Sequence, residues 1–290
     1  MNQLVQVLSN SLTFGSLYSL VALSLVLVFR SSGVLNFGVG FLATFSGIFF
    51  SNFGQGGGIK ALALALLISG CLGSVCYLVA IRPADVKGAH HSTLAISSLG
   101  FGIVVEYFGG HFWAQQGYSP MPLVSGGISI GDTYITSMRI LVVLLSFGAY
   151  LLVHLLIEKT MFGWSMESIA YRKATAALYG VNITVTLICV WFISGVLAGL
   201  AGTMIAPITQ VSLPISLTLA IKGFTACVLG GMTSIKGVLY ASILIATFES
   251  LIILYVSSTY ANALVFLVLF GSLILKPNGI FSTSRAVGRV

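Results

Sequence analysis

Long apolar runs separated by short polar segments make up most of this chain. About 20 apolar residues are needed for a helix to cross the hydrocarbon core of a bilayer. The runs predict nine helical segments, at 9–29, 34–53, 61–81, 93–113, 138–157, 184–206, 216–234, 237–257 and 261–275. Two of them, 34–53 and 216–234, are rich in glycine, and each is predicted either to cross fully or to re-enter.

The predicted fold class is all-α: a polytopic integral membrane protein with eight or nine transmembrane helices, some of them broken or re-entrant. A membrane β-barrel is excluded, because its strands alternate apolar and polar residues over roughly ten positions. The first apolar segment is expected to be a retained span, because no basic stretch precedes it and no small-residue cleavage site follows.

Composition supports the bilayer as the main partner. The 290 residues are 57% hydrophobic and 7% charged, with a mean hydropathy of +1.06. Soluble domains carry roughly 25% charged residues, so a soluble protein is excluded. The net charge of +7 is scattered between apolar blocks, so nucleic acid is not an expected partner. No linker divides the chain, and 1–290 is predicted to form a single transmembrane permease domain.

The distribution of basic residues predicts the orientation, because cytoplasmic loops carry an excess of Lys and Arg. With the N-terminus outside, the C-terminus in the cytoplasm and nine crossings, ten of the thirteen basic residues fall in the cytoplasm and two outside. The remaining one, Lys222, stays in the membrane. The opposite orientation reverses this bias.

Two connections between the spans are long. The outer one, about 114–137, has Pro and Gly punctuation and a short alternating stretch, which predict a loop with a small hairpin. The inner one, about 158–183, contains a predicted helix at about 165–180. Ser165 is a candidate N-cap, Glu167 lies in the first turn, and Gly180 suits the C′ position. Small residues and nearby basic residues are typical either of a helix on anionic lipid or of a docking helix for a cytoplasmic partner.

The end of this predicted helix carries a resemblance to a known family. Thr175-Ala-Ala-Leu-Tyr-Gly180 resembles the Glu-Ala-Ala-x-x-Gly loop of ABC importer permeases, and the whole chain resembles the H-type permease of branched-chain amino acid ABC importers. Matching segments occur in the family's order at 12–23, Gly33-Val-Leu-Asn-Phe-Gly38, Arg82-Pro83, 176–182, Gly195-Val-Leu-Ala-Gly-Leu-Ala-Gly202, 222–231, Ser234-Ile-Lys-Gly237 and Lys276-Pro-Asn-Gly279. The chain departs from the family at Thr175, where the loop usually has Glu, and after Phe37, where Ala-His-Gly is common.

The resemblance implies a permease subunit of an ATP-driven importer for a small polar solute, with a branched-chain or other amino acid favoured, in the bacterial inner membrane. Implied partners are a second homologous permease or a second copy, two cytoplasmic ATPases that bind ATP and Mg, and an external solute-binding protein. The chain has no P-loop, so hydrolysis and cofactor binding are expected only in the partners. The implied ATPase-docking residues are Glu167, Arg172, Lys173, Ala176, Ala177 and Gly180.

Two ionisable residues within the predicted spans are candidates for the solute path. A charge in the bilayer needs a partner or water. Lys222 and Glu249 are predicted either to form a structural pair, with Glu106 as another possible partner of Lys222, or to act at the path. Gly230 and Gly231 are candidates for a helix break. The other path candidates are Asn36, Phe37, Phe224 and Thr225.

Three glycines, Gly195, Gly199 and Gly202, share one helix face and predict close packing against another helix. His90 and His91 have no ligand at metal-binding spacing, and no metal site is predicted. No acid/base pair or activated nucleophile emerges, so an enzyme is not expected. The alternative function is a stand-alone secondary transporter or channel, in which Lys222 and Glu249 would couple or filter the solute.

Overall fold

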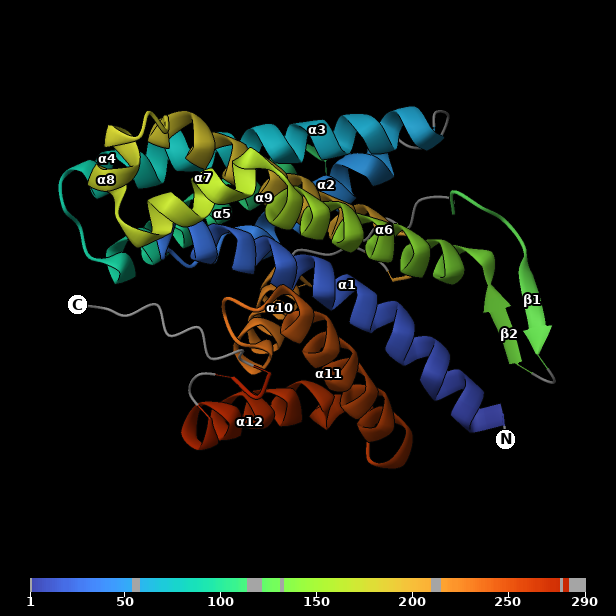
Figure 1. Cartoon of the computed structure of the whole chain (residues 1–290). Helices are drawn as coiled ribbons and strands as arrows, with labels where there is room; N and C mark the ends of the chain where they lie inside the picture. The colour runs from blue at the N-terminus through green and yellow to red at the C-terminus, as the bar shows by residue number, and fades with distance from the viewer. Residues whose placement is uncertain are drawn as a thin grey trace.

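The structure is a computed structural model that describes residues 2–53, 58–113, 122–130, 133–209, 215–276 and 279–281. These residues form a helical bundle with one two-stranded hairpin (Figure 1). The helices are α1 (Asn2–Ser32), α2 (Val39–Phe53), α3 (Gly58–Cys76), α4 (Arg82–Val86), α5 (His91–Trp113), α6 (Ser137–Lys159), α7 (Met161–Tyr171), α8 (Lys173–Leu178), α9 (Ile183–Ile205), α10 (Ile215–Gly230), α11 (Ile235–Tyr255) and α12 (Ser258–Leu275). A π-helical turn, Tyr77–Ile81, joins α3 to α4.

The helices confirm the all-α polytopic fold class. Within the described residues, seven helices are long and apolar enough to cross a membrane. The two glycine-rich segments form the shorter helices α2, with 15 residues, and α10, with 16. At 1.5 Å per residue such a helix spans about 24 Å at most, less than the ~30 Å hydrocarbon core. Each therefore needs non-helical chain to complete a crossing.

The hairpin predicted in the outer connection is confirmed. Strands β1 (Gly127–Ile130) and β2 (Thr133–Thr136) pair antiparallel, from Gly127 opposite Thr136 to Ile130 opposite Thr133. Residues 114–121 of this connection lie outside the described part of the chain. The hairpin and the start of α1 lie at one end of the bundle, and α4 and α8 lie at the other (Figure 1).

The prediction of a single helix at 165–180 is wrong, because parts of two helices, α7 and α8, occupy this segment. Arg172 is extended, with φ −159° and ψ 109°, and separates α7 from α8. The break lets α7 pack against α1 while α8 turns toward α4, a tertiary preference that the local pattern does not contain. Ser165 lies inside α7 and is not an N-cap. Gly180 has the positive φ, +81°, that is typical of the C′ position.

Helix α9 lies at the centre of the bundle, in contact with α1, α2 and α3. The three glycines of its predicted packing face lie at these contacts. A Cβ at Gly195 or Gly199 would overlap Ser69 of α3, and one at Gly202 would overlap the backbone of Ala43 in α2. Small residues at such positions let helix backbones approach closely where lipid supplies no hydrophobic driving force.

Hydrogen bonds between buried hydroxyls add to this packing. Ser69 Oγ donates to the carbonyl of Gly195 at 2.7 Å, and the hydroxyls of Ser24 in α1 and Ser194 in α9 lie 2.7 Å apart. Each such bond contributes on the order of 0.6 kcal/mol in membrane proteins. Together with the glycines, they fix α1, α2 and α3 around one axis.

We expect Gly202→Val to destabilise the protein, because the added side chain must separate α9 from α2. The expected loss in the free energy of unfolding is about 1–3 kcal/mol or more, measured by reversible unfolding in mixed micelles. The matched control is Gly148→Val on α6, where a Cβ would meet no atom within 4 Å. Equal stability of the two variants would contradict the packing role of Gly202.

Candidate functional site

A buried ion pair joins α10 to α11. Lys222 Nζ lies 2.5 Å from Glu249 Oε1, and both side chains are nearly buried, with 10% and 12% of their surface exposed. Tyr18 of α1 completes the cluster: its hydroxyl donates to Glu249 Oε2 at 2.9 Å and accepts from Lys222 Nζ at 3.2 Å. We call these three residues the Lys222 cluster. Of the two carboxylates considered as partners of Lys222, the structure pairs it with Glu249.

The cluster explains how two charges are accommodated in an apolar bundle. Removing an ion from water costs several kcal/mol, which is offset only when the charges pair and their remaining hydrogen-bonding capacity is used. Here the Tyr18 hydroxyl supplies a second hydrogen bond to Glu249 and a second acceptor for Lys222. The sequence pattern did not indicate Tyr18, since a tyrosine within an apolar span is common and carries no spacing signal toward α10.

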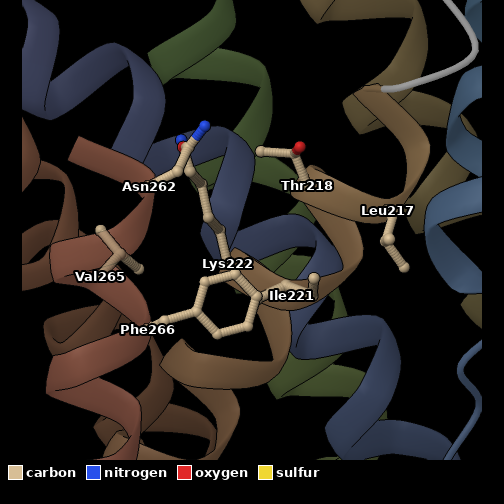
Figure 2. Close-up of a pocket in the computed structure, with 7 residues that line it drawn as sticks. All are labelled: Leu217, Thr218, Ile221, Lys222, Asn262, Val265 and Phe266. Carbon is tan, nitrogen blue, oxygen red and sulfur yellow. The ribbon is translucent and has the colours of Figure 1, made fainter. Parts of the chain in front are cut away.

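A small cavity adjoins the cluster between α10 and α12 (Figure 2). Its volume is about 250 Å³, below the ~300–1,000 Å³ of most small-molecule pockets. Its polar lining comes from Thr218, Lys222 and Asn262, and the rest is apolar: Leu217, Ile221, Val265 and Phe266.

The opposite face of α10 carries an aromatic contact. The rings of Phe224 and Phe37 lie 5.4 Å apart, and both side chains are half-buried. Positions 222 and 224 are about 200° apart around a helix of 3.6 residues per turn. Lys222 and Phe224 thus lie on opposite sides of α10. Thr225 is buried, and its hydroxyl donates to the Ile221 carbonyl at 2.8 Å.

The two adjacent glycines end α10. Gly230 is its last residue, and Gly231 has a φ of +84°, so the chain turns there before Ser234 caps α11. A Cβ at Gly230 would overlap the backbone of Val238, which shows that α10 and α11 approach closely at this turn. The predicted helix break is therefore present, and the glycines shape the turn.

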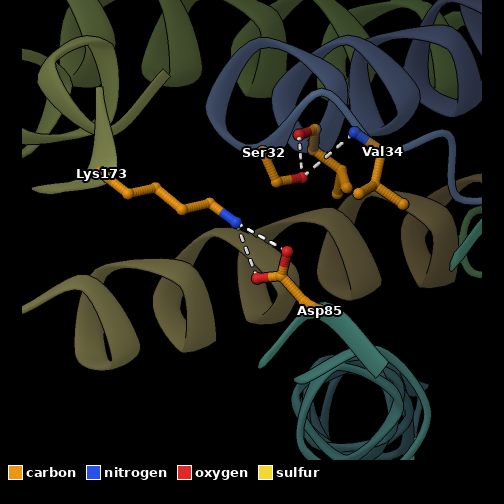
Figure 3. A network of polar contacts seen from close by, with 5 residues as sticks. Ser32, Val34, Asp85 and Lys173 are labelled. Carbon is orange, nitrogen blue, oxygen red and sulfur yellow. Dashed lines mark hydrogen bonds and ion pairs between the residues drawn. The ribbon is translucent and has the colours of Figure 1, made fainter. Parts of the chain in front are cut away.

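Two of the six predicted docking residues form ion pairs with other helices, and the other four differ in how exposed they are. Glu167 is paired with Arg30 at the end of α1, and Lys173 binds both oxygens of Asp85 in α4, at 2.7 and 2.8 Å. Figure 3 shows the second pair, with the Lys173 ammonium group between the two oxygens of Asp85. Ala176 is buried at 2% exposure, whereas Arg172, Ala177 and Gly180 are exposed.

The exposed surface around α8 contains large apolar residues that the candidate set omitted. Leu178 and Tyr179 are 88% and 85% exposed at the end of the bundle. We call Arg172, Ala177, Leu178, Tyr179 and Gly180 the α8 surface. Exposed apolar residues gathered in this way mark interaction sites. Tyr179 could not be identified from the sequence, because its exposure depends on where α8 ends.

Comparisons of the sequence with known proteins identify the family of this chain. The family model described as "Branched-chain amino acid transport system / permease component" matches residues 7–273. The chain belongs to this permease family. The permease is 25% identical to the high-affinity branched-chain amino acid transport system permease protein LivH of Escherichia coli K12, covering 95% of this chain and 94% of LivH. It is 26% identical to the probable LivH of Methanocaldococcus jannaschii, with 94% and 91% covered.

Two further similarities complete the comparison. The permease is 25% identical to BraD, a high-affinity branched-chain amino acid transport system permease protein of Pseudomonas aeruginosa, with 95% of each chain covered. Among solved structures, PsaBC from Streptococcus pneumoniae in complex with Fab gives a TM-score of 0.47 at 13% identity, with 93% of this chain and 91% of that chain covered. At this level of overlap the PsaBC likeness adds nothing to the family assignment.

No group of three His, Cys, Asp or Glu side chains in the described part of the permease could hold a metal ion. Inside the described bundle, Lys222 and Glu249 pair with each other.

We expect Lys222→Met to lower the free energy of unfolding of the permease by about 3–5 kcal/mol, because it leaves Glu249 as an unpaired buried charge. The double variant Lys222→Met/Glu249→Leu should regain most of this loss, since no lone charge remains. Unfolding in mixed micelles measures both, and uptake by the double variant reports whether the charges also serve the path. A single variant as stable as the wild type would contradict the pairing.

Proposed function

We propose that the permease is the transmembrane subunit of an ATP-driven importer for a small polar solute, with a branched-chain or other amino acid as the favoured cargo. The observation that carries the proposal is the α8 surface, which exposes the large apolar side chains of Leu178 and Tyr179 at one end of the bundle (Figure 1). Membership of the permease family and the names of the relatives support the cargo class.

The proposed assembly contains two permease subunits, either two copies or a homologous pair, and two cytoplasmic ATPases that dock on the α8 surfaces and bind ATP and Mg. An external binding protein delivers the solute. We propose a bacterial inner-membrane location with the N-terminus outside. The excess of basic residues in the connections assigned to the cytoplasm supports this orientation, as does the position of the hairpin at the opposite end from α8 (Figure 1).

The proposed mechanism is alternating access driven by closure of the ATPases. Two ion pairs connect the docking helices to the rest of the bundle: Arg30–Glu167 joins α7 to α1, and Lys173–Asp85 joins α8 to α4. Helix α4 continues through the π-helical turn into α3. A displacement of α7 and α8 would thus reach two transmembrane helices directly. Ion pairs this exposed contribute about 0–1 kcal/mol to stability, so their proposed role is connection rather than stabilisation.

The complex with its ATPases, reconstituted in liposomes, should take up solute only when ATP is supplied. Leu178→Asp should abolish ATPase binding and uptake, because it puts a charge into the apolar α8 surface. The matched control is Ile128→Asp, an exposed apolar residue of the hairpin at the opposite end, which should bind the ATPases normally. Uptake without ATP, driven by an ion gradient, would overturn the proposal in favour of a secondary transporter.

The link between α7 and α1 can be tested by charge reversal. Glu167→Arg should leave the ATPases bound and active but reduce the solute transported per ATP several-fold, because two cations now face each other. The combined Arg30→Glu/Glu167→Arg variant should restore the ratio. The control is Glu158→Arg, whose partner His154 lies one turn away on the same helix, so that their pair joins no two elements. An unchanged ratio in Glu167→Arg would contradict the proposed link.

A further inference from the structure

The two short apolar helices of the bundle meet each other. Helices α2 and α10 pack together, and a Cβ at Gly40 in the first turn of α2 would contact Ser216 and Ala220 of α10. In several transporter folds, helices interrupted within the membrane form the solute site, where their free N-terminal N–H groups and positive dipole ends face anionic solute groups.

The start of α2 lies well inside the bundle. The chain between α1 and α2, at 33–38, is not helical, and Phe37 N–H donates to Ser98 Oγ at 3.0 Å. Ser98 is seven residues into α5, about 10 Å from its beginning at 1.5 Å per residue. Non-helical backbone at such a depth is tolerated only where protein buries it or where it lines a cavity.

A buried donor without a partner lies at this helix terminus. Asn36 is fully buried, and its Oδ1 accepts from Gly38 N–H at 3.1 Å, so the amide folds over the first turn of α2. Its Nδ2 group has no hydrogen-bond partner among the described residues. Buried polar groups are almost always hydrogen-bonded, and an unpaired amide at a helix N-terminus suits an anionic oxygen.

A carboxylate faces the same region from α5. Ser98, Gly102 and Glu106 follow one another at four-residue spacing and share one face of that helix. Ser98 binds Phe37, Gly102 lies against Gly38 and Phe41, and Glu106 accepts from Ser216 Oγ at 2.5 Å. Side chains on a helix lean toward its N-terminus, so Glu106 leans toward the turn of α5 that contacts the start of α2.

Two aromatic residues, Phe37 and Phe224, supply apolar surface in the same region. Phe37 directly follows Asn36, and its ring contacts Phe224 of α10, with both side chains half-buried. The region thus combines an unpaired donor at a helix N-terminus, a carboxylate and an aromatic pair. These are the groups that would recognise, respectively, a carboxylate, an ammonium group and an apolar side chain.

We propose that the start of α2 is the solute-binding site of the permease and that it takes α-amino acids with apolar side chains. Asn36 and the N-terminus of α2 bind the solute carboxylate, Glu106 binds the ammonium group, and Phe37 and Phe224 contact the side chain. This assignment rests on the proposed transport function. It places the solute on the face of α10 opposite the Lys222 cluster.

The charge requirement is tested with the wild-type complex in nanodiscs, without the external binding protein. Three radiolabelled probes share the isobutyl side chain: leucine has both charged groups, 4-methyl-2-oxopentanoate has a ketone in place of the ammonium group, and 3-methylbutylamine lacks the carboxylate. Leucine should bind at least about tenfold more tightly than either analogue, because each charge-assisted hydrogen bond lost costs about ten- to a hundredfold in Kd. Equal binding of the three probes, or no binding of any, would overturn the site.

Two substitutions test which residue binds the carboxylate of the solute and which binds its ammonium group. Asn36→Asp keeps the acceptor for Gly38 N–H but replaces the donor with an anion, so leucine binding should fall and the preference should shift toward 3-methylbutylamine. Glu106→Gln keeps an acceptor for Ser216 and should shift the preference toward 4-methyl-2-oxopentanoate. The control is Thr44→Val, which alters another buried, unpartnered polar group on α2, five residues after the first residue of that helix, and should bind leucine normally.

Each result counts for or against the site. Reciprocal shifts in the two variants support it, and unchanged preferences in both overturn it. If either variant fails to assemble, the wild-type probe series still decides whether both charges are needed. ATP-driven uptake by the wild-type complex is measured separately, so the proposed transport function can stand while this site fails.

Discussion

The close approach of α9 to α2 and α3 is the constraint on which the rest of the permease depends. A lipid bilayer offers little hydrophobic force between helices, so the contact relies on small residues and hydrogen bonds. Gly195, Gly199 and Gly202 bring the backbones together, and Ser69 donates across the contact to the carbonyl of Gly195. The contact at Gly202 also fixes the position of α2, and with it the non-helical turn that begins this helix inside the bundle.

Helix α1 takes part in two of the places where opposite charges meet. At one point Tyr18 binds both members of the Lys222–Glu249 pair, and twelve residues later Arg30 pairs with Glu167 of α7. At 1.5 Å per residue, these points are about 18 Å apart along one uninterrupted helix. In the proposed mechanism, α1 is therefore the element that joins the docking helices to the buried pair.

Much of the fold follows from the sequence alone, because hydrophobic length is a strong signal in membrane proteins. The nine apolar segments, the short hairpin and the glycine packing face of α9 are local patterns, and the structure contains all of them. The break at Arg172, the role of Tyr18 and the bond from Ser216 to Glu106 depend on which helices become neighbours. Hydrophobic periodicity identifies the apolar face of a helix. In a chain that is 57% hydrophobic most helix faces are apolar, so periodicity does not tell which helices pack together.

Because α10 is buried on both sides, its charged and its aromatic residues have different neighbours. Lys222 faces α1 and α11, where its charge is balanced and its hydrogen bonds are used. Phe224 contacts the ring of Phe37, the residue that follows Asn36, whose buried amide has no partner among the described residues. A satisfied ion pair gains little from a solute, because binding would first have to separate it, whereas an unpaired donor gains a bond at no such cost. This difference is why the proposed site uses the unpaired amide of Asn36 rather than the Lys222–Glu249 pair.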